Sequence, residues 1–234
     1  MDIIIVFLVF LYGLFIGLSK VKVNNTRPSI NRPNWWIKPE NGNLDIGVWS
    51  HHKNSVGIDI LNNSSNISGH EILDKLNGYK QNNFTFYFDK ILKNEHCDNV
   101  IQYIEKNYDL QSDDFKLEIS KEVLIKLIGI NSFQNLSQLF NDRIDEIKIR
   151  RVKSTNNVIN FHKDHALKTL QVSLNGDDNY VGGKLIFISK DGKVHKLNRK
   201  KGSLTIHDNT IPHGVSKLVG GVRFGLFFLK QRLI

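Results

Sequence analysis

The feature that most constrains the fold is a series of short apolar segments in the C-terminal part of the chain. Turn signals such as Asn175-Gly176, Gly182-Gly183 and Asp191-Gly192 separate them. Short apolar segments between glycine-containing turns are typical of β-strands. The candidate strands cover residues 147–152, 158–162, 168–174, 184–188, 193–197, 203–207 and 222–230. This series predicts a β-sandwich or jelly roll.

Helical periodicity precedes these strands. Apolar residues recur at helical spacing from Glu95 to Tyr108 and again from Leu136 to Ile147. Residues 84–92 resemble a strand that leads into the first helix, and residues 117–128 show a mixed pattern. We therefore predict an α+β, mainly β chain in which N-terminal helices support a jelly-roll core.

The first residues differ in kind from the rest. Residues 3–19 carry no charge and are mostly Ile, Leu, Val and Phe, and a helix of this length spans roughly 25 Å. The segment predicts a single-pass membrane anchor, with a cleaved signal segment or a buried core helix as alternatives. Sidedness stays open, since Lys20 and Lys22 favour a cytosolic catalytic part whereas several N-x-Ser/Thr sequons favour an external one.

Three regions follow along the chain. Residues 1–19 form the anchor or signal segment, residues 20–80 a loosely structured linker rich in Asn, Ser, Gly and Pro, and residues 81–234 the globular domain. The net charge is +9, but the basic residues are scattered. We expect most of them, including the run Arg199-Lys200-Lys201, on a solvated surface. One cysteine, Cys97, excludes an intramolecular disulfide.

A His-x-Asp motif lies at the end of the second candidate strand. Residues two apart on a strand project from the same face, so His162 and Asp164 can aim at one point. A second histidine from another strand, His213, would complete a facial triad of two histidines and one carboxylate. Such a triad leaves open positions on an octahedral metal and is typical of non-haem Fe(II) oxygenases. His-x-Asp alone is a weak signal, and the downstream residues give it weight.

An arginine follows His213 on the most apolar strand of the chain. Arg223 stands in the segment Val222 to Leu229, where burying a guanidinium is costly unless it is paired. A dicarboxylate supplies that partner, because the guanidinium fork binds a carboxylate through two hydrogen bonds. Gly225 shares the face of Arg223 and is expected to leave room beside it. A structural ion pair with an Asp or Glu is the alternative.

The stretch from Phe84 to Lys230 resembles the prolyl 4-hydroxylase-like branch of the Fe(II)/2-oxoglutarate-dependent dioxygenases. The matching pieces are His162-x-Asp164, Tyr180 to Leu185, Gly202 to Ile206, His213-Gly214-Val215 and Gly221 to Phe224. The resemblance covers about the C-terminal two thirds of the chain. It is more specific for the cofactor and cosubstrate than for the substrate.

The resemblance implies a double-stranded β-helix core with residues 81–234 as the dioxygenase domain. It implies iron bound by His162, Asp164 and His213, and Arg223 on the distal carboxylate of 2-oxoglutarate, with O2 as oxidant and ascorbate as reductant. The chain departs from the family where many members carry lysine instead of Arg223, and a tyrosine usual before the His-x-Asp motif is absent. As further cosubstrate contacts we expect Thr169, Gln171 and Thr205, which are polar residues on predicted core strands.

The implied reaction is hydroxylation of a C–H bond with release of succinate and CO2. A prolyl residue of a protein or peptide is the expected target, and a lysyl residue or a small molecule is the alternative. Nucleic acid is disfavoured, because demethylases of the same superfamily carry a second arginine where this chain has Leu229. A different class is a non-enzymatic, membrane-tethered jelly-roll binding module. The sequence leaves the oligomeric state open.

Overall fold

The computed structural model describes residues 68–81 and 86–232. The expected anchor at residues 3–19 and most of the expected linker at residues 20–80 lie outside these ranges. Within them, no helix has both the length and the apolar character needed to cross a bilayer.

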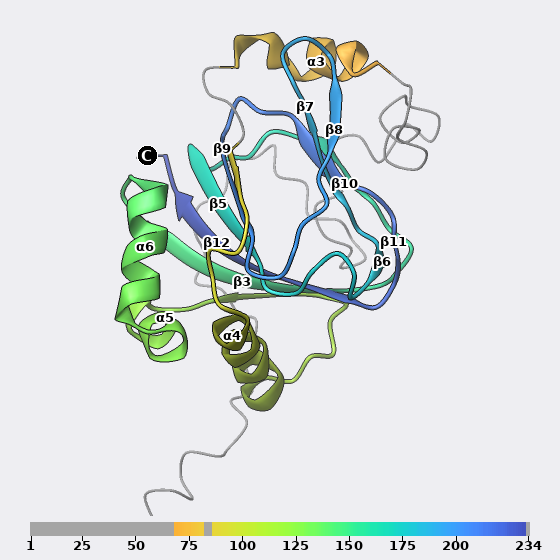
Figure 1. Ribbon diagram of the computed structural model, residues 1–234. Helices are drawn as coiled ribbons and strands as arrows, with labels where there is room; N and C mark the ends of the chain where they lie inside the picture. The colour runs from red at the N-terminus through yellow and green to blue at the C-terminus, as the bar shows by residue number, and fades with distance from the viewer. Residues whose placement is uncertain (1–67, 82–85, 233–234) are drawn as a thin grey trace, which may run out of the picture.

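The described residues form a few helices followed by many short strands (Figure 1). The helical segments are α3 (His70–Leu76), the 3-10 turn η1 (Gly78–Lys80), α4 (Asn94–Asn107), α5 (Lys121–Ile128) and α6 (Ile130–Phe140). The strands are β1 (Phe86–Phe88), β2 (Asp114–Glu118), β3 (Glu146–Lys153), β4 (Ile159–His162), β5 (Lys168–Ser173), β6 (Val181–Gly182), β7 (Leu185–Ile188), β8 (Val194–Lys196), β9 (Leu204–Asp208), β10 (His213–Val215), β11 (Leu218–Gly220) and β12 (Val222–Lys230).

The strands assemble into two main antiparallel sheets. The large sheet has the order β1-β9-β5-β12-β3-β2, and the small sheet has the order β4-β10-β7-β8. Helices α4, α5 and α6 lie on one side of the large sheet, and the small sheet lies on the other (Figure 1). A pair of short strands, β6 and β11, closes one end. This arrangement confirms the predicted mainly β, jelly-roll architecture with supporting helices.

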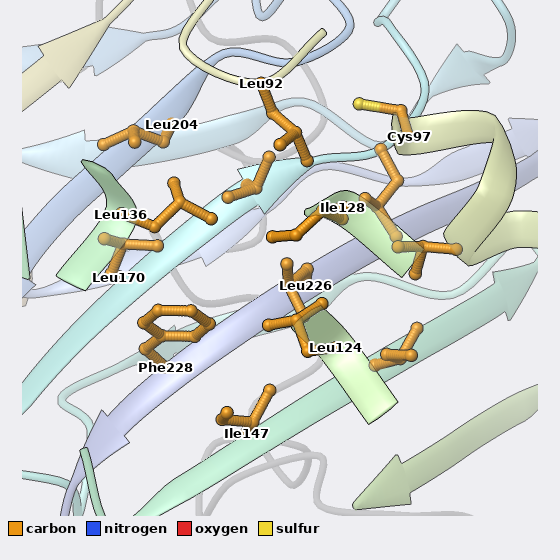
Figure 2. Packing of buried hydrophobic residues seen from close by; sticks show 14 of the residues in the cluster. Leu92, Cys97, Leu124, Ile128, Leu136, Ile147, Leu170, Leu204, Leu226 and Phe228 are labelled. Atoms are coloured by element: carbon orange, nitrogen blue, oxygen red, sulfur yellow. The ribbon is translucent and has the colours of Figure 1, made fainter. Parts of the chain in front are cut away.

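The two faces of the large sheet differ in chemistry, as the alternation of side chains along a strand requires. The helix side carries the main apolar core, to which β5, β9 and β12 contribute Leu170, Val172, Leu204, Ile206, Leu226 and Phe228 (Figure 2). Cys97 of α4 is part of this core, and burial raises the pKa of its thiol to about 12. The opposite face of the same strands is polar and turns toward the small sheet.

The small sheet lies between helix α3 and the large sheet, and both of its faces carry apolar side chains. Its outer face packs Phe161, Ile186 and Ile188 against Ile72 and Leu73 of α3. Helix α3 falls inside the expected linker, so folded structure begins before residue 81. The inner face carries a second apolar cluster that includes Leu185, Phe187 and Val215. Both sheets therefore bury apolar side chains on their outer faces, and between them the polar face of the large sheet meets the partly apolar inner face of the small sheet.

One predicted helix has different bounds in the structure. The helix predicted over residues 136–147 is α6, which covers Ile130–Phe140 and ends there because Asn141 adopts a left-handed conformation (φ 46°). Ile147, counted as helical, belongs to β3. The mixed segment 117–128 divides into the end of β2 and all of α5, which begins at a Ser120 cap whose hydroxyl accepts a hydrogen bond from the Val123 backbone N–H.

Candidate active site

Two neighbouring strands of the small sheet bring the predicted histidines together. His162 is the last residue of β4 and His213 the first of β10, and the two are direct register partners. Side chains opposite each other in an antiparallel pair project from the same face. Their ring centroids lie 4.4 Å apart.

Asp164 reaches the same point by a different route from the one the sequence suggested. Strand β4 ends at His162, so Asp164 stands in the following turn and not on the strand. One of its carboxylate oxygens, Oδ1, lies 3.6 Å from Nε2 of His162 and 3.5 Å from Nε2 of His213. The three ligand atoms all lie within 4.8 Å of one another, so His162, Asp164 and His213 could hold one metal ion.

Backbone hydrogen bonds orient both imidazoles. Nδ1 of His162 lies 2.8 Å from the carbonyl oxygen of Asn160, and Nδ1 of His213 lies 3.0 Å from that of Ile211. A carbonyl oxygen can only accept, so each Nδ1 carries the hydrogen. In the neutral form of each ring, Nε2 then carries the lone pair and faces the point that the two rings share with Asp164. This is the tautomer that metal-binding histidines require.

The second oxygen of Asp164 is fixed by the large sheet. Thr169 donates its hydroxyl to Oδ2 over 2.6 Å, and Nε2 of His207 lies 3.0 Å from the same oxygen. Thr169 and His207 are register partners on β5 and β9. Burial raises the pKa of Asp164, but His213 and hydrogen bonds from the neighbouring histidines outweigh burial and hold that pKa well below its usual value. The carboxylate stays ionised, with Oδ1 directed at the histidines.

We expect Thr169→Val to weaken metal binding about 10-fold, in line with the usual effect of losing a hydrogen bond to a ligand. Valine keeps the shape of the side chain and removes only the hydroxyl that holds Asp164. The matched control is Ser203→Ala, directly before the adjacent strand β9, because the buried Ser203 hydroxyl has no hydrogen-bond partner among the described residues. Titration of both variants with Mn(II) checks this, and equal affinities would contradict a supporting role for Thr169.

Arg223 lies elsewhere on the polar face of the large sheet. It is on β12 and only 8% exposed. Within the part of the chain that the structure describes, it forms no ion pair with a carboxylate. Burial and the nearby Arg199 guanidinium lower the pKa of Arg223 from 12.5 to about 9. A charged, buried and uncompensated guanidinium favours an anionic ligand. The space beside Arg223 that Gly225 was expected to leave is taken by the Phe227 ring, which a Cβ at Gly225 would approach to 2.9 Å.

The other three predicted contacts separate into two groups. Thr169 is committed to Asp164 and so belongs with the triad. Gln171 lies beside Arg223. Thr205 on β9 is the register partner of Gln171. The hydroxyl of Thr205 is buried and has no hydrogen-bond partner among the described residues. An unsatisfied buried hydroxyl is uncommon, and a bound polar ligand would satisfy it.

Three residues of this interior were not predicted to lie in the site: His207, Arg199 and Asp177. His207 contacts Asp164 directly. Arg199, expected on the surface, is 3% exposed and is bonded to the buried Asp177 and Tyr180. Arg199 follows Leu197 by two residues, and this strand-like spacing was the available signal that both face inward.

Comparisons of the sequence identify no relative, since no family model and no curated protein matches it significantly. Solved structures do match. The viral collagen prolyl hydroxylase of Paramecium bursaria Chlorella virus-1, solved as a 2OG complex, superposes with a TM-score of 0.50 at 16% identity, over 63% of this chain and 96% of that one. The chain has the prolyl hydroxylase-like 2OG-Fe(II) oxygenase fold.

Further oxygenases give lower scores. A Pseudomonas putida prolyl-4-hydroxylase is 14% identical, with a TM-score of 0.48 over 70% of this chain and 98% of that one. A 2OG-Fe(II) oxygenase from Burkholderia pseudomallei is 12% identical, with a TM-score of 0.49 over 62% of this chain and 82% of that one. The fold assignment rests on the viral enzyme alone, and at 16% identity the activity has to be argued from the site itself.

Proposed function

We propose that this chain is an Fe(II)- and 2-oxoglutarate-dependent dioxygenase. The observation that carries the proposal is the pairing of two features in one interior. Two oriented imidazole Nε2 atoms and one carboxylate oxygen converge at the inner face of the small sheet. Arg223, buried and without a carboxylate partner in the described part of the chain, stands on the large sheet that faces them. A metal chelator with a distal carboxylate satisfies both.

The residues present fit both groups. His162, Asp164 and His213 would hold the iron, a donor set of two nitrogens and one oxygen that suits non-haem Fe(II). Arg223 would bind the distal carboxylate of 2-oxoglutarate, with Gln171 and the unsatisfied Thr205 hydroxyl beside it. When bound, the iron and 2-oxoglutarate would supply O2 activation, so that a C–H bond becomes C–OH while 2-oxoglutarate and O2 yield succinate and CO2.

The protein contributes geometry and exclusion of water. Thr169 and His207 hold the Asp164 carboxylate so that one oxygen stays available. Phe187 flanks the triad, with its ring centroid 5.4 Å from that of His207 and 5.5 Å from that of His213. This apolar ring covers the buried His207 and His213, and an apolar neighbour that excludes water strengthens charge interactions beside it.

The substrate we propose is a prolyl residue in a protein or peptide. The support is the matching motifs from Phe84 to Lys230 and the fold shared with a viral collagen prolyl hydroxylase. A lysyl residue or a small molecule is the alternative within the same chemistry. A membrane anchor or secretory signal at residues 3–19 would place the activity at a membrane or in the secretory pathway.

Mass spectrometry of peptides tests the substrate. Proline-containing and lysine-containing peptides would be incubated with the protein, Fe(II), 2-oxoglutarate and ascorbate. We expect a mass gain of one oxygen atom on proline, absent when either Fe(II) or 2-oxoglutarate is omitted. Oxygen on lysine alone would replace the prolyl assignment. A folded protein that binds neither Fe(II) nor 2-oxoglutarate would favour the non-enzymatic binding module.

A further inference from the structure

A second arginine lies in the interior beside Arg223. Arg199 stands between β8 and β9 and is 3% exposed, although its neighbours Lys200 and Lys201 lie at the surface and pair with Asp89 and Asp98. A buried guanidinium is costly, so its position has to be held by specific partners. The contacts of Arg199 show what it does there.

Asp177 anchors Arg199 from both backbone and side chain. Its Oδ1 accepts from Nη2 of Arg199 over 3.3 Å, and its Oδ2 accepts from the Arg199 backbone N–H over 3.0 Å. The Asp177 backbone N–H donates to the Arg199 carbonyl over 2.8 Å. Nη2 also donates to the Tyr180 hydroxyl over 3.1 Å. Asp177 is therefore a direct ion-pair partner of Arg199, whereas among the described residues no carboxylate lies within ion-pair distance of Arg223.

Gln171 joins the two arginines. With its amide oxygen turned toward them, it accepts from Nη1 of Arg199 over 3.2 Å and from Nη2 of Arg223 over 2.8 Å. The opposite amide orientation would place the NH2 group against donors only, so hydrogen bonding selects this one. The chain of contacts runs from Asp177 through Arg199 and Gln171 to Arg223.

We propose that Arg199 is a positioning residue that sets the affinity of this site for the distal carboxylate of a 2-oxo dicarboxylic acid. The inference rests on the proposed function. Arg199 fixes the Gln171 oxygen, and Gln171 fixes one arm of Arg223 so that the remaining donors are preorganised for the carboxylate. Preorganisation increases affinity because a bound ligand no longer has to order the groups that contact it. The second positive charge also strengthens attraction for an anion.

The test measures ligand binding in the absence of turnover, on the full chain loaded with Mn(II). We expect Arg199→Gln to raise the Kd of 2-oxoglutarate about 10-fold, the size of one hydrogen bond to a charged group. The Kd of Mn(II) should change less than about twofold, because Arg199 forms no hydrogen bond or ion pair with the triad. Pyruvate has the same 2-oxoacid end without the distal carboxylate, and its Kd should also stay within about twofold.

Two further variants complete the design. The double variant Asp177→Asn/Arg199→Gln replaces both members of the buried ion pair with neutral amides. Lys184 also pairs with the Asp177 carboxylate, but it is partly exposed and keeps its hydrogen bond to the Asp177 carbonyl oxygen. This double variant should raise the Kd of 2-oxoglutarate as much as Arg199→Gln does. The control is Arg150→Gln, because Arg150 also acts electrostatically on Arg223 but is paired with Asp114 and has no bond to Gln171. It should leave the Kd of 2-oxoglutarate within about twofold.

The outcomes separate the two proposals. If the unchanged protein binds 2-oxoglutarate and both Arg199 variants bind it equally well, the role of Arg199 is refuted and the proposed function stands. If the Arg199 variants lose equal affinity for 2-oxoglutarate and for pyruvate, Arg199 has a general structural role, and the proposed positioning role is refuted. If the Mn(II)-loaded unchanged protein does not bind 2-oxoglutarate, the proposed function itself fails.

Discussion

Replacing Asp164 with alanine is expected to abolish the Fe(II)-dependent formation of succinate from 2-oxoglutarate. The variant loses the only carboxylate of the triad and the group that Thr169 and His207 hold in place. Removing a partner of a ligand typically costs 10- to 100-fold in metal affinity, so removing the ligand itself should cost more than about 100-fold. His162→Ala should have the same effect. Succinate release and Fe(II) content of the purified variants check the result.

His165→Ala is the matched control. His165 is one residue beyond Asp164 and is exposed, and it is not among the residues whose ligand atoms converge. Its loss should leave both iron content and succinate formation near those of the unchanged protein. Full activity in Asp164→Ala or His162→Ala would refute the assignment of His162, Asp164 and His213 as the metal ligands. Loss of iron in His165→Ala would mean that the wrong histidine has been assigned.

Replacing Arg223 with methionine is expected to change ligand affinity and stability in opposite senses. Truncating one partner of a buried charge pair costs about 2 kcal/mol or more, so the Kd of 2-oxoglutarate should rise at least about 30-fold. Without ligand, however, Arg223 is buried near Arg199, and residues 68–81 and 86–232 offer it no carboxylate partner. An apolar side chain of similar length should therefore leave the melting temperature of the ligand-free protein unchanged or raise it.

This pair of readouts decides between the two interpretations of Arg223. A ligand-binding arginine is destabilising until the ligand arrives. An arginine in a structural ion pair is stabilising, and breaking such a pair is strongly destabilising. A clear fall in the melting temperature of ligand-free Arg223→Met, together with unchanged 2-oxoglutarate binding, would contradict the assignment. The measurements are thermal unfolding without ligand and calorimetric titration of the Mn(II)-loaded protein.

The architecture was predictable because most strands are long enough to be recognised as apolar segments between turn residues. Strand β12, for example, was predicted with both ends correct. Strand β2 was missed because it runs into the segment 117–128, whose pattern is mixed. The other missed strands, β6, β10 and β11, have only two or three residues, and β10 carries His213. Periodicity cannot be recognised over so short a stretch. His213 was instead identified through its place before Arg223 in the chain, which does not depend on the strand.

The polar interior was only partly predictable, because its residues meet through tertiary contacts. Asp164 stands beyond its strand and is fixed by Thr169 and His207 of the other sheet. Arg199 lies in a basic run of a kind that is usually solvated, and only the fold brings Asp177 close enough to bury it. Local patterns predict which face a side chain takes, whereas the pairing of buried charges depends on chain segments far apart in sequence.

The most direct test of the account is the conversion of 2-oxoglutarate to succinate by the purified chain. We expect succinate to form only when Fe(II) and O2 are both supplied. A metal chelator should stop succinate formation, and an oxidisable peptide should accelerate it. A folded, Fe(II)-loaded protein that leaves 2-oxoglutarate unconverted with or without peptide would contradict the assignment of a dioxygenase.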